Sequence, residues 1–417
     1  MPVIDPAVGI WIVAAVATCG VILRPWRVPE YVWALLGALL LVVLGWITPG
    51  TALKAVAEGG DVYLFLVGMM VLAELARRQG LFDWLAMYAV QHARGSGTRL
   101  FNLVFLVGTL VTVFLSNDAT AVVLTPAVYA ACRAAKAEPL PYLFICAFIA
   151  NAASFVLPIS NPANLVVFGT QMPPLLDWLR QFTLPSLAAI GLTYLVLRLT
   201  QRRQITQPLA TAIELQPLSG GARLCALGIM VTALVLVSTS ALDQPLGLPT
   251  FCAGLATAAL VHLGQRRSPL PLLKGVAWGV LPLVAGLFVL VEAVAQTGLI
   301  ERLAHGLADL ARHDPVQANW AAGLGSALAG NLMNNLPTGL IAGSIGHIVQ
   351  LPTATTAALL IGVDLGPNLS ITGSLATLLW LVAIRREGKH VGALDFLRLG
   401  VLVMPPALLG ALLALHI

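Results

Sequence analysis

Two parts of this sequence, roughly half the chain apart, place polar residues and prolines inside segments that are otherwise apolar. In the first part, residues 116–120 (SNDAT) are followed by residues 160–164 (SNPAN). In the second, residues 334–338 (NNLPT) are followed by residues 364–368 (DLGPN). Non-helical backbone at membrane depth is tolerated only where it is buried in protein or lines a wet cavity. A duplicated pair of such breaks is typical of the substrate site of a secondary transporter.

The composition places most of the chain in a membrane. The sequence is 59% hydrophobic and 10% charged, whereas a soluble domain carries about 25% charged residues. The first half predicts crossings at 6–23, 31–48, 62–76 and 184–197, an amphipathic helix at 81–91, a re-entrant hairpin at 100–131 and a broken helix at 142–171. The second half predicts crossings at 224–237, 251–263, 276–295 and 396–417, an amphipathic helix at 299–311, a hairpin at 320–349 and a broken helix at 353–384.

The two halves also match each other in sequence. Residues 68–86 align without gaps with residues 286–304, and Gly68/Gly286 and Glu74/Glu292 are among the identical pairs. Counting each broken helix as one crossing gives five crossings per half, an odd number, so the second half would be inverted relative to the first. We therefore predict an all-α polytopic membrane protein with two inverted-topology repeats, 1–199 and 224–417, joined by a cytoplasmic linker at 200–223.

Positive charge indicates the orientation in the membrane. If the loop with Arg24 and Arg27 is cytoplasmic, 19 of the 23 basic residues lie on the same side. This asymmetry satisfies the positive-inside rule. It predicts a multi-pass protein of the inner (plasma) membrane with both termini on the outer face. Because topology accounts for the net charge of +5, no nucleic acid partner is predicted. The basic residues left outside are Lys54, Arg180, Arg302 and Arg312.

The breaks supply neutral hydrogen-bonding groups for a substrate. No Arg or Lys falls inside either pair of motifs, although a carboxylate or phosphate substrate is usually met by a cation or by several helix N-termini. This neutrality favours a neutral, hydroxyl-bearing solute or a small cation. The predicted substrate-binding residues are Ser116, Asn117, Thr120, Asn161, Asn164, Asn334, Asn335, Thr338, Asn368 and Thr372.

Two acids lie in these apolar stretches, Asp118 and Asp364. A carboxylate inside a membrane is costly and is therefore a functional candidate by default. A structural role is the alternative, because Asp is also a favoured N-cap. Asp118 stands at one hairpin tip while Asn335 stands at the other, which favours an ion or proton role for Asp118. For Asp364 the two roles are equally open.

Other classes of protein find little support. The five cysteines are scattered without metal spacing, and no HExxH or GxSxG pattern appears, so we expect no metal site, no cofactor and no enzyme activity. A channel would not need inverted hairpins. A sodium-coupled or sodium/proton carrier stays open, since asparagines and a carboxylate also suit sodium.

Several runs resemble a known family. Residues 114–118 (FLSND), 333–338 (MNNLPT), 364–367 (DLGP) and 373–380 (GSLATLLW) are similar to those of the arsenite/antimonite efflux permease (ArsB-type) family of the ion transporter superfamily. The similarity covers essentially the whole chain. Members of that family commonly carry Lys just after the Gly-Pro, where this chain has Asn368.

The resemblance implies export of trivalent arsenic or antimony as the neutral trihydroxide, driven by proton exchange and alternating access. Asp118, and in second place Asp364, would load the proton outside and release it inside. Capture of arsenic by thiolates is not expected, since no Cys lies in any of the motifs. Some family members also work with a cytoplasmic ATPase subunit, for which the linker would be the docking loop.

Overall fold

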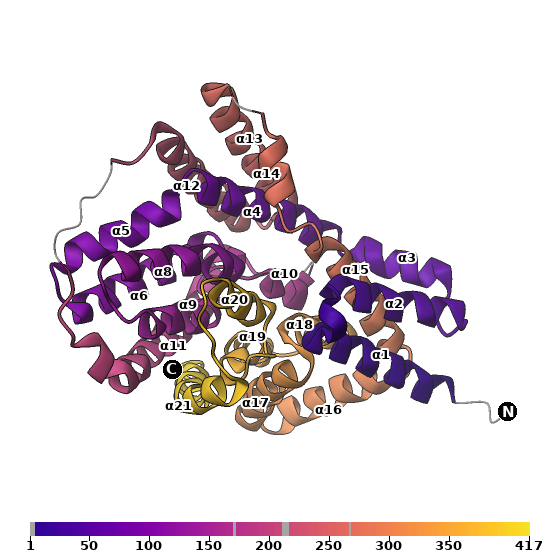
Figure 1. Ribbon diagram of the computed structural model, residues 1–417. Helices are drawn as coiled ribbons and strands as arrows, with labels where there is room; N and C mark the ends of the chain where they lie inside the picture. The colour runs from indigo at the N-terminus through magenta and orange to yellow at the C-terminus, as the bar shows by residue number, and fades with distance from the viewer. Residues whose placement is uncertain (1–4, 170–171, 211–216, 267) are drawn as a thin grey trace.

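The computed structural model describes residues 5–169, 172–210, 217–266 and 268–417, and these fold into helices (Figure 1). In the first half they are α1 Pro6–Leu23, α2 Glu30–Val43, α3 Pro49–Glu58, α4 Gly60–Arg78, α5 Leu81–Ala93, α6 Gly97–Phe114, α7 Asn117–Ala119, α8 Thr125–Ala134, α9 Leu140–Ala152, α10 Pro162–Phe168 and α11 Leu175–Ile205. In the second half they are α12 Gly220–Ala241, α13 Gly247–Gln265, α14 Leu270–Gly275, α15 Val280–Ala295, α16 Leu299–His313, α17 Pro315–Met333, α18 Asn335–Ile348, α19 Thr353–Leu365, α20 Leu375–Arg386 and α21 Ala393–Ala414.

Several helices have the length and composition of membrane spans. Among the described residues six pass both criteria, namely α1, α6, α11, α12, α13 and α21. Two bent pairs raise the number to as many as eight: α3 with α4, bent by 49°, and α15 with α16, bent by 74°. Outer helices such as α1, α2, α12 and α13 expose rows of Leu, Val and Trp, as lipid-facing helices do. The all-helical, polytopic character predicted from the sequence is therefore present.

The order of elements in the first half recurs in the second. Each half has two helices, a short helix, a longer helix that leads into an amphipathic one, two helices joined by a tight turn, a broken helix and a long final helix. The packing recurs as well: α4 packs on α13 as α15 packs on α2, and α6 packs on α9 as α17 packs on α19. The two final helices, α11 and α21, pack on each other.

Equivalent glycines make close contacts between the halves. A Cβ on Gly68 of α4 would lie 2.4 Å from the carbonyl oxygen of Thr250 in α13. A Cβ on Gly286 of α15 would lie 2.8 Å from the carbonyl carbon of Ala34 in α2. Both positions need glycine because the backbone of the other half occupies the space of a side chain.

The element bounds differ from the sequence prediction in a few places. The short helices α3 and α14 were not predicted, because they are too short to give a hydrophobic span. The predicted crossing at 184–197 is the middle of the 31-residue α11, whose polar ends are also helical. The stretch 200–223 is therefore not all linker: α11 continues to Ile205 and α12 begins at Gly220. Residues 211–216 of this stretch, and 170–171 at the end of the first predicted broken helix, lie outside the described residues.

Helices α9, α18, α19 and α20 occupy the centre of the molecule, and α1–α3 and α12–α14 lie toward its periphery (Figure 1). The central helices are densely buried; the stretch Ile145–Ala153, for example, is buried at every residue. The chain breaks of both halves lie in this central region, next to the site described below.

Candidate functional site

The two hairpin tips and the two broken helices meet at one small cavity of about 30 Å³. By volume the cavity holds on the order of two water molecules. Among the residues that line it are Asn117, Asp118, Asn161 and Asn335, which the sequence predicted for the site. The lining contains no Lys or Arg, and the other lining residues are Leu66, Pro162, Val280, Val284, Leu336, Leu375 and Ala376.

The first tip is a sharp turn between α6 and α7. Ser116 caps α7, and its hydroxyl accepts a hydrogen bond from the backbone N–H of Ala119 at 3.3 Å. The chain then passes through a π-helical turn at Thr120–Leu124 before α8 begins. Single π-turns of this kind are frequent at functional sites. The hydroxyl of Thr120 lies 2.8 Å from that of Thr112 in α6, so Ser116 and Thr120 hold the turn together and do not line the cavity.

Asp118 is the acid at this tip. It lies in the first turn of the helix, where the positive end of the helix dipole stabilises a carboxylate. The side chain lines the cavity, and no hydrogen bond to its carboxylate occurs within the described part of the chain. Asn117 lies beside it; its Oδ1 accepts from the backbone N–H of Asp118 at 2.8 Å, and its Nδ2 has no partner among the described residues.

The second tip is built on Asn334 and Asn335. Asn334 has a φ of +81°, a region in which Asn is enriched among non-glycine residues. It caps α18, and its Nδ2 donates to the carbonyl of Thr372 at 3.2 Å. The hydroxyl of Thr338 donates to the carbonyl of Asn334 at 2.8 Å. Asn334 and Thr338 therefore fix the turn, and the side chain of Asn335 is the one that lines the cavity.

The first broken helix is tied to the second through an asparagine and an acid. Asn161 caps α10 by accepting from the backbone N–H of Ala163 at 3.0 Å. Its Nδ2 donates to Oδ1 of Asp364 in α19 at 2.7 Å. Asp364 is fully buried, and its Oδ2 has no partner within the described residues. Asp364 therefore contacts a cavity residue without lining the cavity itself.

Asn164 supports the break from within the same half. Its Nδ2 lies within hydrogen-bond reach of three carbonyls, those of Ser154 at 2.8 Å, Leu157 at 3.2 Å and Pro158 at 3.2 Å. These carbonyls belong to the segment between α9 and α10, where the helical ladder is interrupted. Asn164, which the sequence predicted to bind substrate, therefore donates hydrogen bonds to the backbone, and it is fully buried.

Two asparagines that the sequence analysis did not single out complete the network. Asn151 of α9 donates through Nδ2 to Oδ1 of Asn368 at 3.0 Å, and Asn368 donates to the carbonyl of Phe148 at 3.0 Å. Asn331 of α17 donates to the carbonyl of Gly366 at 2.7 Å, and the hydroxyl of Thr372 donates to the carbonyl of Asn331 at 3.2 Å. Asn151 and Asn331 also lie in apolar stretches. The pattern that identified the other asparagines, a polar residue inside an apolar segment, would therefore have identified these two as well.

The site offers neutral amides, one free carboxylate and the starts of several helices. Residues at or beside the N-termini of α7, α10, α18 and α20 all line the cavity. Such ends carry partial positive charge. No group of three or more His, Cys, Asp or Glu suited to a metal occurs among the described residues. The arrangement can bind a small polar solute and carry a proton on Asp118.

Comparison with known proteins identifies the family. A family model described as "Citrate transporter" (CitMHS) matches residues 11–384. The chain belongs to the citrate transporter family of the ion transporter superfamily. This transporter is therefore a multi-pass membrane protein and not an enzyme, and the superfamily predicted from residues 364–367 and 373–380 is confirmed.

Relatives extend along most of the chain. An arsenical pump membrane protein of Escherichia coli (strain K12) is 29% identical over 399 residues, 92% of each chain. A protein of the same name from Yersinia enterocolitica is 29% identical over 363 residues, 84% of each chain. An uncharacterized transporter, Rv2684, of Mycobacterium tuberculosis is 28% identical over 393 residues, 90% of this chain and 91% of its own.

A solved structure shares the fold. The crystal structure of the Alcanivorax borkumensis YdaH transporter superposes with a TM-score of 0.59 at 18% sequence identity. The match covers 88% of this chain and 86% of that one. The comparison supports the polytopic helical fold of this secondary transporter.

Proposed function

We propose that this transporter exports arsenite or antimonite, as the neutral trihydroxide, in exchange for protons. The observation that carries the proposal is the cavity itself: its polar lining is neutral except for one acid, Asp118. The amides of Asn117 and Asn335 can both donate to and accept from hydroxyl groups. Relatives that carry the name arsenical pump membrane protein along 92% of the chain support the same solute.

Asp118 is the proposed proton carrier. A charged carboxylate without a partner is costly in a membrane interior. We therefore expect the carboxyl group of Asp118 to gain or lose a proton when the site opens from one side of the membrane to the other. Asp364 is the second candidate, because its Oδ2 is buried without a partner in the described part of the chain. Asn161, which bonds Asp364 and lines the cavity, would link the two acids.

Alternating access would use the two halves as inverted repeats. The hairpins and broken helices would move as one body against a scaffold that includes α4 and α15, since Leu66 and Val284 of these helices form the other wall of the cavity. A cavity with room for about two waters is too small for the solute with its hydration, so loading requires a more open conformation. We place the protein in the inner membrane with both termini outside, from the distribution of basic residues.

Everted membrane vesicles provide the test. Arsenite should accumulate in energised vesicles, a protonophore should abolish the accumulation, and sodium should not be needed. Asp118→Asn should lose accumulation driven by the proton gradient while the purified protein elutes as a single folded species. Asp83→Asn, which removes an exposed acid on α5, is the control and should transport normally. Full transport by Asp118→Asn would remove that residue from the mechanism, and sodium-driven or absent arsenite flux would contradict the proposal.

A carrier of a small carboxylate is the second candidate. It is favoured by the helix starts at the cavity, which are suited to an anion, and by the family description "Citrate transporter". The Asp118 carboxylate opposes it, because an anion would be repelled unless Asp118 is protonated. Citrate offered to the same vesicles decides between the two: citrate flux without arsenite flux would support this candidate. Sodium coupling, the remaining alternative, is tested by imposing a sodium gradient in the same assay.

A cytoplasmic ATPase subunit stays a prediction of the family resemblance. The connection between α11 and α12 would receive it. The start of this connection is hydrogen-bonded to the helix bundle. The backbone N–H of Leu209 donates to the carbonyl of Gly95 at 2.9 Å, and that of Ala210 donates to the carbonyl of Ala135 at 3.0 Å. Co-purification of the full chain with such a subunit, lost when residues 206–219 are replaced by a Gly/Ser segment, is the test.

A further inference from the structure

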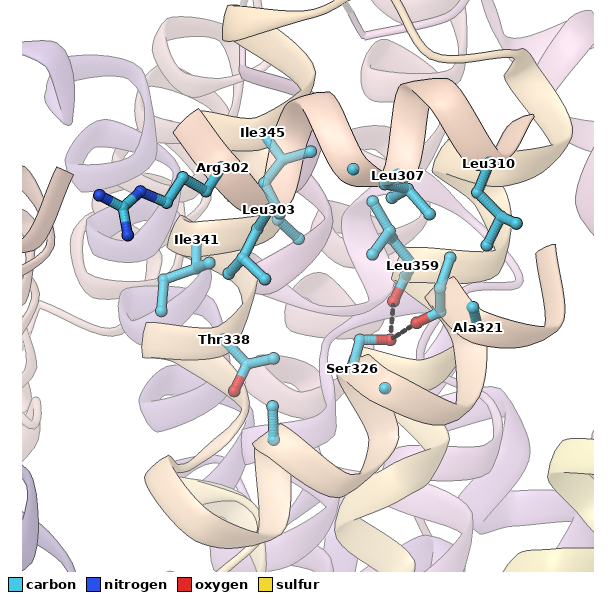
Figure 2. A pocket seen from close by; sticks show the side chains of 15 residues that line it. Arg302, Leu303, Leu307, Leu310, Ala321, Ser326, Thr338, Ile341, Ile345 and Leu359 are labelled. Atoms are coloured by element: carbon cyan, nitrogen blue, oxygen red, sulfur yellow. Dashed lines mark hydrogen bonds between the residues drawn. The ribbon is translucent and has the colours of Figure 1, made fainter. Parts of the chain in front are cut away.

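A second, larger hollow lies between the amphipathic helix α16 and the second hairpin. Its volume is about 490 Å³, within the range of small-molecule sites. Figure 2 shows Leu303 and Leu307 of α16 facing Ile341 and Ile345 of α18 across this groove. Alanines and glycines of α16, α17 and α18 complete the walls, so the groove is almost entirely apolar.

Two glycines keep the groove open. A Cβ added to Gly306 of α16 or to Gly325 of α17 would have no atom within 4 Å apart from its own neighbourhood in the chain. Both residues line the groove. The space beside them is therefore empty of protein, and the neighbouring helices do not require glycine there for their own packing.

The polar side chains inside the groove have protein partners. The hydroxyl of Ser326 donates toward the carbonyls of Ala322 at 2.7 Å and Leu359 at 2.9 Å. The hydroxyl of Thr338 donates to the carbonyl of Asn334. A polar solute would find few partners along this route, so the groove is not suited to carry a trihydroxide toward the tip.

The groove has a cation at its edge. Arg302 is exposed and lies at one end of the lining (Figure 2). Within the described residues its guanidinium forms no ion pair, whereas Arg312 on the same helix pairs with Asp309 at 3.3 Å. An apolar groove with a cation at its edge is complementary to a ligand that has an apolar chain and an anionic head.

We propose that this groove binds an acyl chain of an anionic membrane phospholipid, whose phosphate pairs with Arg302. The polar face of α16 carries Arg302 and Arg312 together with the acids Glu301 and Asp309. An amphipathic helix with a charged polar face lies at the level of the lipid headgroups, where Arg302 can meet a phosphate. The inner end of the groove touches Thr338, three residues after Asn335 of the second tip. The lipid would thus contact the hairpin that carries the candidate substrate site. This inference holds whichever solute is transported.

Native mass spectrometry of the full chain tests the proposal. The transporter is released from nanodiscs that contain equal amounts of phosphatidylglycerol and phosphatidylcholine. The wild type should retain one phosphatidylglycerol. Gly306→Leu and Gly325→Leu, which fill the groove, should lose it. Arg302→Gln should lower the preference for phosphatidylglycerol roughly fivefold, the effect of about one basic residue on an anionic lipid.

Two matched variants serve as controls. Gly191→Leu adds a side chain at an exposed glycine of α11 that also has open space around it, and Arg312→Gln removes the other arginine of α16. Both should retain the lipid. Phosphatidylglycerol should also raise the unfolding temperature of the wild type but not of Gly325→Leu, because a ligand stabilises only the state that binds it. Equal retention by the wild type and both groove variants would overturn the proposal; equal retention of the two lipids by the wild type would overturn the role of Arg302.

Discussion

At the scale of single residues, the contact between Asn161 and Asp364 joins the two halves of the molecule at its centre. The Oδ1 of Asn161 accepts the hydrogen bond that caps α10, and its Nδ2 donates to Oδ1 of Asp364. Both residues are buried, with 2% and 0% of their surface exposed. A buried polar group that loses its partner keeps the full cost of desolvation, so this contact should matter for stability whatever its part in transport.

Replacing Asn161 by alanine tests this contact. Asn161→Ala should lower the free energy of unfolding by about 1–3 kcal/mol, the cost of leaving a buried group without its partner. Unfolding of the purified protein in detergent, followed by circular dichroism, measures the change. The control is Asn102→Ala: Asn102 is exposed, and its Oδ1 accepts from Tyr194 and Arg198, both at 2.9 Å. Equal stability of the two variants would show that Asp364 does not depend on Asn161.

The sequence predicted which residues gather at the centre better than it predicted what each one does there. Asn117 and Asn335 line the cavity, whereas Asn164 and Asn368 donate to backbone carbonyls around the breaks. Both uses require the same side chain in the same kind of apolar stretch. The difference lies in the direction of each side chain, which depends on tertiary packing and leaves no trace in the local sequence.

At the scale of elements, the breaks and the amphipathic helices followed from local sequence, because Pro, Gly and Asn interrupt helices for local reasons. The helix ends followed less well. The polar turns of α11 beyond Leu197 remain helical. Hydropathy shows which residues lie in the hydrocarbon region of the membrane, but it does not show where a helix ends. The short helices α3 and α14 gave no hydrophobic signal because each spans fewer residues than a crossing needs.

The glycines at which elements of the two halves cross carry a second prediction. Gly68→Ala and Gly286→Ala should each destabilise the protein by about 1–3 kcal/mol, because the added methyl group overpacks a contact with backbone. The size of the two effects should be similar, since the two positions are equivalent. Thermal unfolding in detergent is the measurement.

Gly60→Ala is the matched control within α4. A Cβ at Gly60 meets nothing within 4 Å, so this substitution should leave stability within about 0.5 kcal/mol of the wild type. If Gly68→Ala were as stable as Gly60→Ala, the crossing of α4 and α13 would be loose enough to accept a side chain, and glycine there would not be a packing requirement.

At the scale of the whole molecule, the two halves are similar. Their elements follow the same order, and each half packs one helix on the other half in the same way, α4 on α13 and α15 on α2. The alignment of residues 68–86 with 286–304 predicted this similarity, because it includes the glycine of each contact. The cavity could not be predicted from the sequence, because residues of both halves line it and neither half contains it alone. The proposed inversion of the two halves across the membrane has a direct consequence for the two amphipathic helices.

If the repeats are inverted, α5 and α16 lie at opposite membrane surfaces. Gln91 of α5 and His313 of α16 are both exposed, so single cysteines at these positions report the two surfaces in a background without the exposed Cys19 and Cys252. A membrane-impermeant maleimide should label His313→Cys in right-side-out vesicles and Gln91→Cys in everted ones. The opposite pattern would keep the inversion and reverse the orientation inferred from the basic residues. Labelling of both cysteines from one side would contradict inverted repeats, and the two hairpin tips would then have to reach their common cavity from the same face of the membrane.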